Sequence, residues 1–197
     1  MIVHDLHKVR VDMAHPVLIV PGLNGSAPGH WQSWWRQDHR SAILVEQGDW
    51  NNPDADQWLA VLEAAVRQHP GSLIVAHSLG SVLTARLATS PVATLVAGAL
   101  LVAPADIERT QSLQGRSYEF GRMPRQALPF PNMVVASRDD VYMPFSMARE
   151  LAVAWGSSVR DMGYAGHINI ASGFGRWPEA YALARQVLTA GPISARA

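Results

Sequence analysis

Short apolar runs separated by amphipathic stretches dominate the pattern of this chain. Four mostly apolar runs, each bounded by turn-forming residues, are predicted as strands: 17–20, 72–76, 95–102 and 133–136. Runs without polar alternation are typical of strands that are covered on both faces of a parallel sheet. Two shorter segments, 42–45 and 158–161, are weaker strand candidates.

Helical periodicity occurs between these strands. Trp58, Leu62 and Val66 share one face of a segment that begins at Asp54. Further helices are expected at 31–36, 79–89, around 147–155 and 178–188. Strands and helices that alternate at this spacing indicate parallel β-α-β units. We therefore expect an α/β protein, a three-layer α/β/α sandwich with about six mainly parallel strands.

The chain has no internal repeat, low-complexity tract or linker. Its 197 residues fit one domain, so a single domain over 1–197 is predicted. Residues 1–14 are expected to form an extended lead-in. Residues 104–131 are the one long stretch with no predicted element, and loops of that length are usually functional. We expect an irregular insertion there, near the functional site, acting as a lid or contacting substrate.

Composition and charge narrow the function classes. Sixteen Lys and Arg balance sixteen Asp and Glu, so the basic excess of a nucleic-acid-binding protein is missing. The chain has no cysteine, which excludes a thiol nucleophile, a disulfide and a cysteine-ligated metal. The charged N-terminus does not match a signal peptide, and the longest apolar run is shorter than the about 20 residues of a membrane span. A cytoplasmic location without a membrane partner is expected.

The segment 76–80 carries the strongest chemical signal. It reads Ala-His-Ser-Leu-Gly between an apolar strand and a helix, which is the setting of a nucleophile elbow. Ser78 would stand on a tight turn with Oγ exposed, and the residues two before and two after it must be small. Gly80 meets that demand, whereas Ala76 replaces the usual glycine. The alternative is a serine in an ordinary strand-to-helix turn.

A serine nucleophile needs a general base, which in turn needs an orienting acid. In this arrangement the chain order is Ser, Asp or Glu, then His. Of eight histidines, His167 alone follows Ser78, in a loop between the last strand and the last helix. His77 adjoins the nucleophile, but its side chain should leave the turn in another direction.

The acid is expected just after the strand at 133–136. Asp140 is preferred for its spacing of four residues before Pro144, and Asp139 is the alternative. A capping role for this aspartate pair is the non-catalytic interpretation. Asp106 and Asp161 are weaker candidates.

Two main-chain N–H groups are predicted to bind the oxyanion. One belongs to Leu79, the residue after the nucleophile, and the second to Leu23 in the loop after the first strand. No metal site is predicted, since His4-x-x-His7 has no further ligand at suitable spacing. No cofactor is predicted either, since the sequence has neither a P-loop nor G-x-G-x-x-G at a strand–helix junction. The arginines of the insertion are expected to be solvated, although one could meet an anionic substrate group: Arg109, Arg116, Arg122 and Arg125.

With these residues in hand, the chain resembles the small serine hydrolases of the retinoblastoma-binding-protein-9/YdeN type. The matching stretches are VLIVPGLNGSAPGHWQSWW, IVAHSLGS, VASRDDVYMPF and GHINIASGFGRWPE, in that order. The resemblance implies an α/β-hydrolase fold with little or no cap, and a catalytic triad on Ser78, Asp140 and His167. Ala76 departs from the glycine that relatives often have.

The combined hypothesis is a cofactor-independent serine hydrolase. Small carboxylic esters are the first substrate class and short amides or peptides the second, by family analogy. The main alternative is a hydrolase-shaped protein-interaction module with a vestigial triad. A Rossmann-like cofactor-binding protein is the third possibility, and it lacks the glycine fingerprint.

Overall fold

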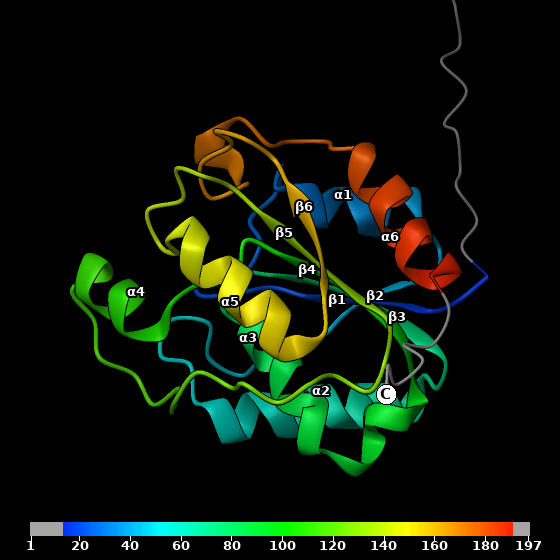
Figure 1. Cartoon of the computed structure of the whole chain (residues 1–197). Coiled ribbons are helices and arrows are strands. Elements are labelled where there is room, and N and C mark those ends of the chain that lie inside the picture. The colour runs from blue at the N-terminus through cyan, green and yellow to red at the C-terminus, as the bar shows by residue number, and fades with distance from the viewer. Residues whose placement is uncertain (1–13, 191–197) are drawn as a thin grey trace, which may run out of the picture.

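The computed structural model describes residues 14–190. The lead-in expected at 1–14, apart from its last residue, and the His4-x-x-His7 pair lie outside this range. The described chain forms one six-stranded sheet (Figure 1), whose strands are β1 (Val17–Val20), β2 (Ala42–Leu44), β3 (Ser72–His77), β4 (Val96–Val102), β5 (Asn132–Ala136) and β6 (Ser158–Asp161). All neighbouring strands are parallel, in the order β2-β1-β3-β4-β5-β6.

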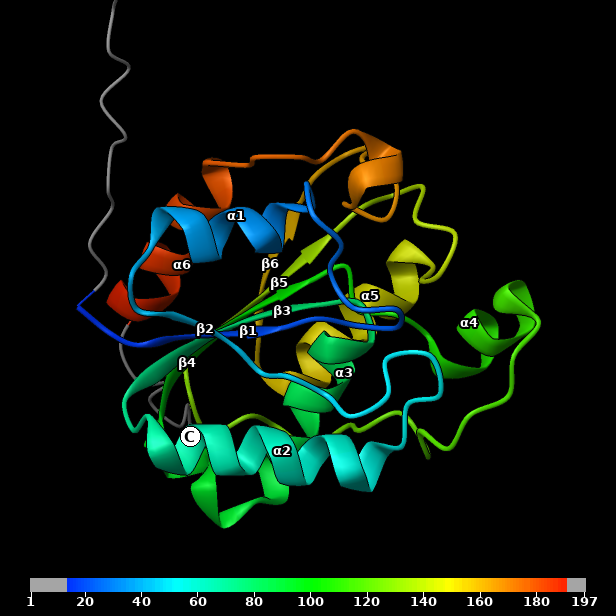
Figure 2. The same cartoon turned by 180° about the vertical axis from the view of Figure 1, so that it is seen from behind.

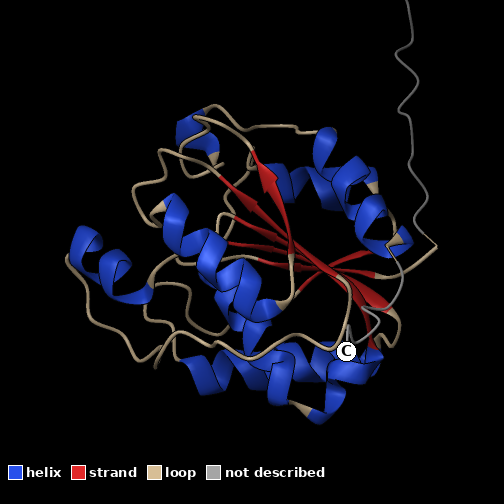
Figure 3. Cartoon of the chain, viewed as in Figure 1, coloured by secondary structure: helices blue, strands red, loops and turns tan. Residues whose placement is uncertain are grey.

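Helices cover both faces of this sheet. One face carries α1 (Trp31–Asp38) and α6 (Glu179–Thr189), and the other carries α2 (Ala55–Gln68), α3 (Leu79–Ala85) and α5 (Phe145–Trp155). Figure 2 shows the molecule from behind, and Figure 3 shows the strands enclosed between the two helical layers. The predicted three-layer α/β/α sandwich is confirmed.

The uninterrupted apolar runs follow from burial on both sides. Val17 and Ile19 pack against the α1 and α6 side, whereas Leu18 and Val20 pack in the cluster with α2, α3 and α5. Successive strand side chains point to opposite faces, so a strand inside a three-layer sandwich needs an apolar residue at every position. β6 is the exception, because it is an edge strand with exposed residues.

The order of the strands fixes where a ligand can bind. β1 lies between β2 and β3. The chain therefore adds β2 on one side of β1 and all later strands on the other side. Open α/β sheets bind ligands outside the carboxyl ends of the strands at such a switch point. The loops that begin at Pro21 and Ser78 leave β1 and β3 there. The loops after β5 and β6 leave the same edge, because all the strands are parallel.

The insertion at 104–131 is not wholly irregular as expected, because it contains the helix α4 (Ile107–Gln114). Asp106 caps its first turn by accepting from the N–H of Arg109, and Gly115 ends it in a left-handed conformation at φ 59°. The sequence of α4 is mostly polar, so no apolar stripe identified it. In Figure 1, α4 projects from the body of the molecule.

The predicted helix over 79–89 is shorter than expected. α3 ends at Ala85 and continues as a 3₁₀ helix, η1 (Arg86–Thr89), which a second one follows, η2 (Pro91–Leu95). Pro91 disfavours a helical conformation at the residue before it, and α-helices commonly tighten into 3₁₀ geometry in their last turn.

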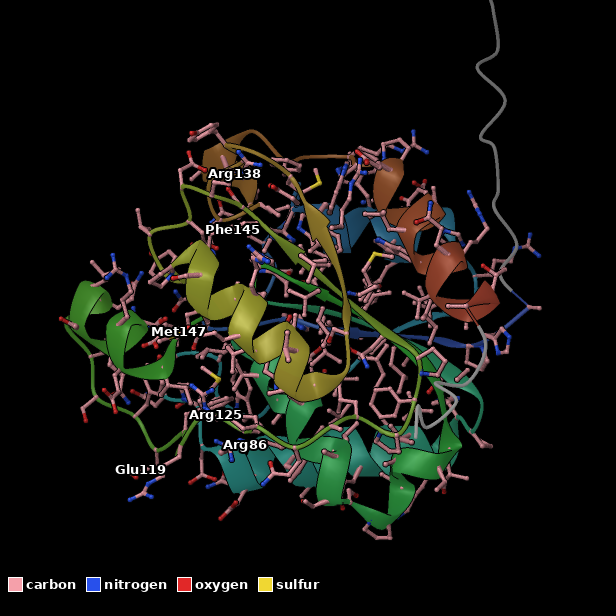
Figure 4. All side chains as sticks on the ribbon, viewed as in Figure 1. Arg86, Glu119, Arg125, Arg138, Phe145 and Met147 are labelled. Carbon is pink, nitrogen blue, oxygen red and sulfur yellow. The ribbon has the colours of Figure 1, made fainter. Side chains whose placement is uncertain are left out.

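Main-chain carbonyls of the insertion are hydrogen-bonded to the body of the protein. The Arg86 guanidinium, labelled in Figure 4, donates to the carbonyl of Phe120 and, at 2.9 Å, to that of Arg122. Trp155 Nε1 donates to the carbonyl of Pro124 at 2.9 Å. Arg116, predicted to be solvated, donates to Asn24 Oδ1 at 2.8 Å. The insertion is therefore hydrogen-bonded to η1, to α5 and to the loop after β1.

Candidate active site

Ser78 occupies a strained turn between β3 and α3. Its backbone has φ 57° and ψ −127°, a region that residues with a Cβ rarely adopt and that costs about 1–3 kcal/mol. Two main-chain hydrogen bonds hold the turn, from the Ser78 N–H to Val102 O and from the Ser81 N–H to Ser78 O, both at 3.0 Å. The sequence motif at 76–80 therefore has the backbone of a nucleophile elbow.

The two small residues of the motif, Ala76 and Gly80, are tightly packed. A Cβ on Gly80 would overlap the carbonyl oxygen of Val20 and stand 2.5 Å from that of Pro21. Ala76 is fully buried in the core and is paired with Val20 and Leu101 in the sheet. Its methyl group is part of the packed core, which accommodates alanine in place of the usual glycine.

Replacing Gly80 tests how tightly the elbow is packed. We expect Gly80→Ala to lower the free energy of unfolding by about 3 kcal/mol, because the added methyl must push the β1 carbonyls aside. Urea unfolding followed by circular dichroism measures the loss. Gly48→Ala is the matched control, because nothing lies within 4 Å of that position. Equal unfolding midpoints for the two variants would contradict the close approach.

Three of the predicted residues meet above the carboxyl edge of the sheet. Ser78 Oγ donates to His167 Nε2 at 3.0 Å, and His167 Nδ1–H donates to Asp140 Oδ2 at 2.8 Å. All three are buried, with 7–8% of each residue exposed. The second Asp140 oxygen accepts the N–H of Tyr142 at 2.8 Å, which fixes the carboxylate. In this tautomer the Nε2 lone pair faces the hydroxyl, as proton abstraction requires.

The other carboxylate candidates have different partners. Asp139 Oδ1 accepts from Ser137 Oγ at 2.6 Å and from the Gly166 N–H at 2.8 Å, and these hydrogen bonds lower the pKa of Asp139. Asp139 therefore shapes the loop that leads to His167 without touching the imidazole. Asp106 caps α4, and Asp161 forms an ion pair at 2.7 Å with Arg138 of the β5–α5 loop (Figure 4).

Two buried side chains hold the loop that carries His167. His77 Nε2–H donates to the main-chain carbonyl of His167 at 2.9 Å, and Trp31 Nε1–H donates to that of Ile168 at 2.8 Å. Ile168 is itself strained, at φ 49°. No sequence motif predicted such a role for His77 or Trp31. Each of these hydrogen bonds joins residues 90 or more positions apart, so no local sequence pattern predicts it. Both residues do lie in the sequence stretches that carry the family resemblance.

The rings of His30, His77 and His167 lie in a row. The ring of His77 lies 4.9 Å from those of His30 and His167, measured between centroids. Burial, with the nearby His167, lowers the pKa of His30 to about 4. Burial, together with the neighbouring His167 and His30, lowers the pKa of His77 well below its usual value. Both rings are therefore neutral at neutral pH.

These shifts predict acid sensitivity between about pH 6.5 and pH 4. The unfolded chain takes up protons on both histidines near pH 6.5, whereas the folded chain does not, so stability is lost as the pH falls. The free energy of unfolding should decline by up to about 1.4 kcal/mol per pH unit for each histidine. Urea unfolding at several pH values measures the slope. His77→Phe should flatten it, and an unchanged slope in that variant would refute the assignment.

The predicted oxyanion donors border the elbow. A Cβ on Gly22 would lie 2.8 Å from Ser78 Cβ and 2.9 Å from the Leu79 nitrogen, so the segment leading into Leu23 runs directly against the turn. Within residues 14–190, the N–H groups of Leu23 and Leu79 have no hydrogen-bond acceptor. Within this described range, both N–H groups are therefore unpaired beside the elbow.

A cavity of about 330 Å³ opens at Ser78 and His167. Thr110 and Gln114 of α4 form part of its wall, so the insertion contributes directly to the site. Gln114 Nε2 donates to the Tyr142 hydroxyl at 2.6 Å, and the Tyr142 ring lies 4.6 Å from that of His167. The complete lining is Leu23, Asn24, Gly25, Ala27, His30, His77, Ser78, Thr110, Gln114, Tyr142, His167, Asn169, Ile170 and Ala171. The lining contains no Asp, Glu, Lys or Arg.

Among residues 14–190, no group of three or more histidine, cysteine or acidic side chains is arranged to hold a metal ion. No helix in the same range has the length and apolar character needed to cross a bilayer.

Comparison with known proteins identifies relatives over most of the chain. A family model described as "Serine hydrolase" matches residues 17–186. The YdeN protein of Bacillus subtilis is 24% identical over 180 residues, which cover 86% of this chain and 94% of that protein. A YdeN-like protein of Pectobacterium atrosepticum superimposes with a TM-score of 0.75 at 30% identity, over 89% of this chain and 92% of that one.

The fold extends to more distant proteins. Esterase 2 of Thermogutta terrifontis, solved with propionate bound, has a TM-score of 0.63 at 17% identity, over 92% of this chain and 85% of that one. At this identity the likeness concerns the fold alone.

Proposed function

The chain belongs to the serine hydrolase family, and from this membership we propose that it hydrolyses small carboxylic esters through an acyl-enzyme on Ser78. The proposal rests on the two hydrogen bonds that join Asp140 to His167 and His167 to Ser78 Oγ. A serine hydroxyl is a weak nucleophile until a base removes its proton. This site has the base at 3.0 Å and an acid that orients the base.

In the proposed mechanism, His167 Nε2 takes the proton of Ser78 Oγ while Oγ attacks the ester carbonyl. The N–H groups of Leu23 and Leu79 stabilise the oxyanion. Each such donor typically contributes about 3–4 kcal/mol of transition-state stabilisation. The protonated imidazole then gives its proton to the departing alcohol, and the carbon–oxygen bond of the ester breaks. Water, deprotonated by the same histidine, attacks the acyl carbonyl. The bond to Ser78 Oγ then breaks, Oγ takes the proton from the imidazolium, and the carboxylic acid is released.

The cavity supports small, uncharged substrates. Its volume of about 330 Å³ lies at the lower end of the range for small-molecule sites, and no charged side chain lines it. Short esters fit this description best, and short amides or peptides are the second class. Amides demand more from the same groups because an amine is a poorer leaving group than an alcohol.

Covalent labelling tests the proposal. A fluorophosphonate probe should add once per molecule in intact-mass spectrometry, and peptide mapping should locate the adduct at Ser78. Ser78→Ala should abolish labelling, while Ser81→Ala, three residues along the same elbow, should still react. A folded wild-type protein that remains unlabelled would contradict the proposal and favour a hydrolase-shaped interaction module.

A further inference from the structure

His30 lies in the cavity wall immediately before α1. It is 6% exposed, and its Nδ1 accepts the N–H of Gln32 at 3.2 Å, so it caps the helix. A neutral imidazole has one acceptor nitrogen and one N–H. Because Nδ1 is the acceptor, the proton of this neutral ring is on Nε2.

The Nε2–H of His30 has no acceptor among the described residues. The ring is held by packing against Trp31 and His77, at centroid distances of 5.4 and 4.9 Å. His77 directs its own Nε2–H to the carbonyl of His167. Since the Nδ1 edge of His30 faces the backbone of α1, the Nε2 edge is the one left for a molecule in the cavity.

Several other polar side chains around the cavity have hydrogen-bond partners within the protein. Gln114 Nε2 donates to the Tyr142 hydroxyl, and Thr110 Oγ1 donates to the carbonyl of Asp106 at 2.5 Å. Asn24 Oδ1 accepts from Arg116. With no charged group in the lining, recognition here depends on hydrogen bonds. His30 offers a rigidly held donor for that purpose.

The position of His30 indicates which part of a substrate reaches it. In the mechanism above, the leaving oxygen lies beside His167, because it receives the proton from that ring. His77 contacts both other histidine rings, so His30 is one ring further from the leaving group. In a pose with the leaving oxygen beside His167, the acyl chain is the part of the substrate left to extend toward His30.

We propose that His30 is a specificity-determining residue whose Nε2–H donates a hydrogen bond to an oxygen within the acyl chain. The site therefore prefers acyl groups with an ether or carbonyl oxygen a few bonds from the scissile ester over plain alkyl groups of the same length. This inference rests on the proposed function and adds a substrate class to it.

Matched substrate pairs test the preference. Each pair of p-nitrophenyl esters differs by one oxygen in place of a methylene: methoxyacetate and butanoate, 3-methoxypropanoate and pentanoate, 4-methoxybutanoate and hexanoate. The measured quantity is the ratio of kcat/KM within each pair. Dividing the wild-type ratio by the ratio of a variant cancels the intrinsic reactivity of the esters and any general loss of activity.

Two variants remove the donor in different ways. His30→Asn keeps an oxygen that can cap α1, and His30→Phe keeps a ring without an N–H. In at least one pair we expect the wild-type ratio to exceed both variant ratios by about tenfold, the usual effect of one hydrogen bond. His39→Asn is the control, since His39 is a buried histidine at the other end of α1 and outside the cavity lining.

The outcomes separate this inference from the proposed function. Ratios that stay the same in both variants for all three pairs, with Ser78 still labelled by the probe, overturn the role of His30 and leave the hydrolase intact. If one variant fails to fold, the other gives the same comparison. A wild-type protein that neither hydrolyses an ester nor labels at Ser78 overturns both.

Discussion

Ser78→Ala is expected to lower kcat/KM for p-nitrophenyl acetate by about 10⁴-fold or more. The substitution removes the atom that would form the acyl-enzyme, and His167 Nε2 loses its partner at 3.0 Å. Residual hydrolysis should remain, because the oxyanion donors and the cavity still position an ester for attack by water. Initial rates at several ester concentrations, with a background correction, measure the loss.

The fold should survive this substitution. Alanine keeps the Cβ at φ 57°, so the backbone strain is unchanged and the free energy of unfolding should shift by less than about 1 kcal/mol. Ser81→Ala is the control, because it removes a fully buried hydroxyl that donates to Val102 O at 3.2 Å on the same elbow. It should cost stability but retain activity within a few-fold. A Ser78→Ala enzyme that keeps a tenth of the wild-type rate would refute the role of Ser78 as the nucleophile.

The sheet could be predicted because its strands are buried on both faces. β1 and β3 appear in the sequence as unbroken apolar runs, and the fully buried pattern of both strands explains why. Such runs also mark where the connecting loops leave the carboxyl edge, which is where the site lies. The edge strand β6 has exposed residues, and its segment was accordingly a weaker strand candidate in the sequence.

The wall of the cavity could not be predicted in the same way. α4 is polar over most of its length and rests on the body through few apolar contacts, so neither periodicity nor hydrophobicity distinguishes it from a loop. Its contribution to the site depends on Gln114 reaching Tyr142, 28 positions later. Likewise, the donor on His30 is identifiable only once the partner of its other ring nitrogen is known.

The choice between Asp139 and Asp140 marks the limit of sequence reasoning at this site. Both follow β5, and both have the right chemistry. Adjacent side chains in a turn point in different directions, so the conformation of the loop decides which carboxylate reaches the imidazole. Here Asp140 meets His167 Nδ1, while Asp139 turns to Ser137 and the N–H of Gly166.

Asp140→Asn is accordingly expected to lower kcat by about 10³–10⁴-fold, with little change in KM. The amide can still accept the Tyr142 N–H, so the loop keeps its shape. Its NH₂ group, however, favours the tautomer of His167 that has the proton on Nε2, and that tautomer cannot take the proton of Ser78. An amide also cannot stabilise the imidazolium that forms as Oγ attacks. Steady-state kinetics with p-nitrophenyl acetate measure both parameters.

Asp139→Asn provides the control, because it removes the same charge one residue away. That carboxylate supports the His167 loop through Ser137 and Gly166, so its neutral analogue should lose less than about tenfold in kcat. The ratio of kcat between the two variants separates the effect on the imidazole from the effect of the lost charge. If Asp139→Asn proves the more damaging substitution, Asp140 is not the orienting acid, and the contact at 2.8 Å between its Oδ2 and His167 Nδ1 has no catalytic role.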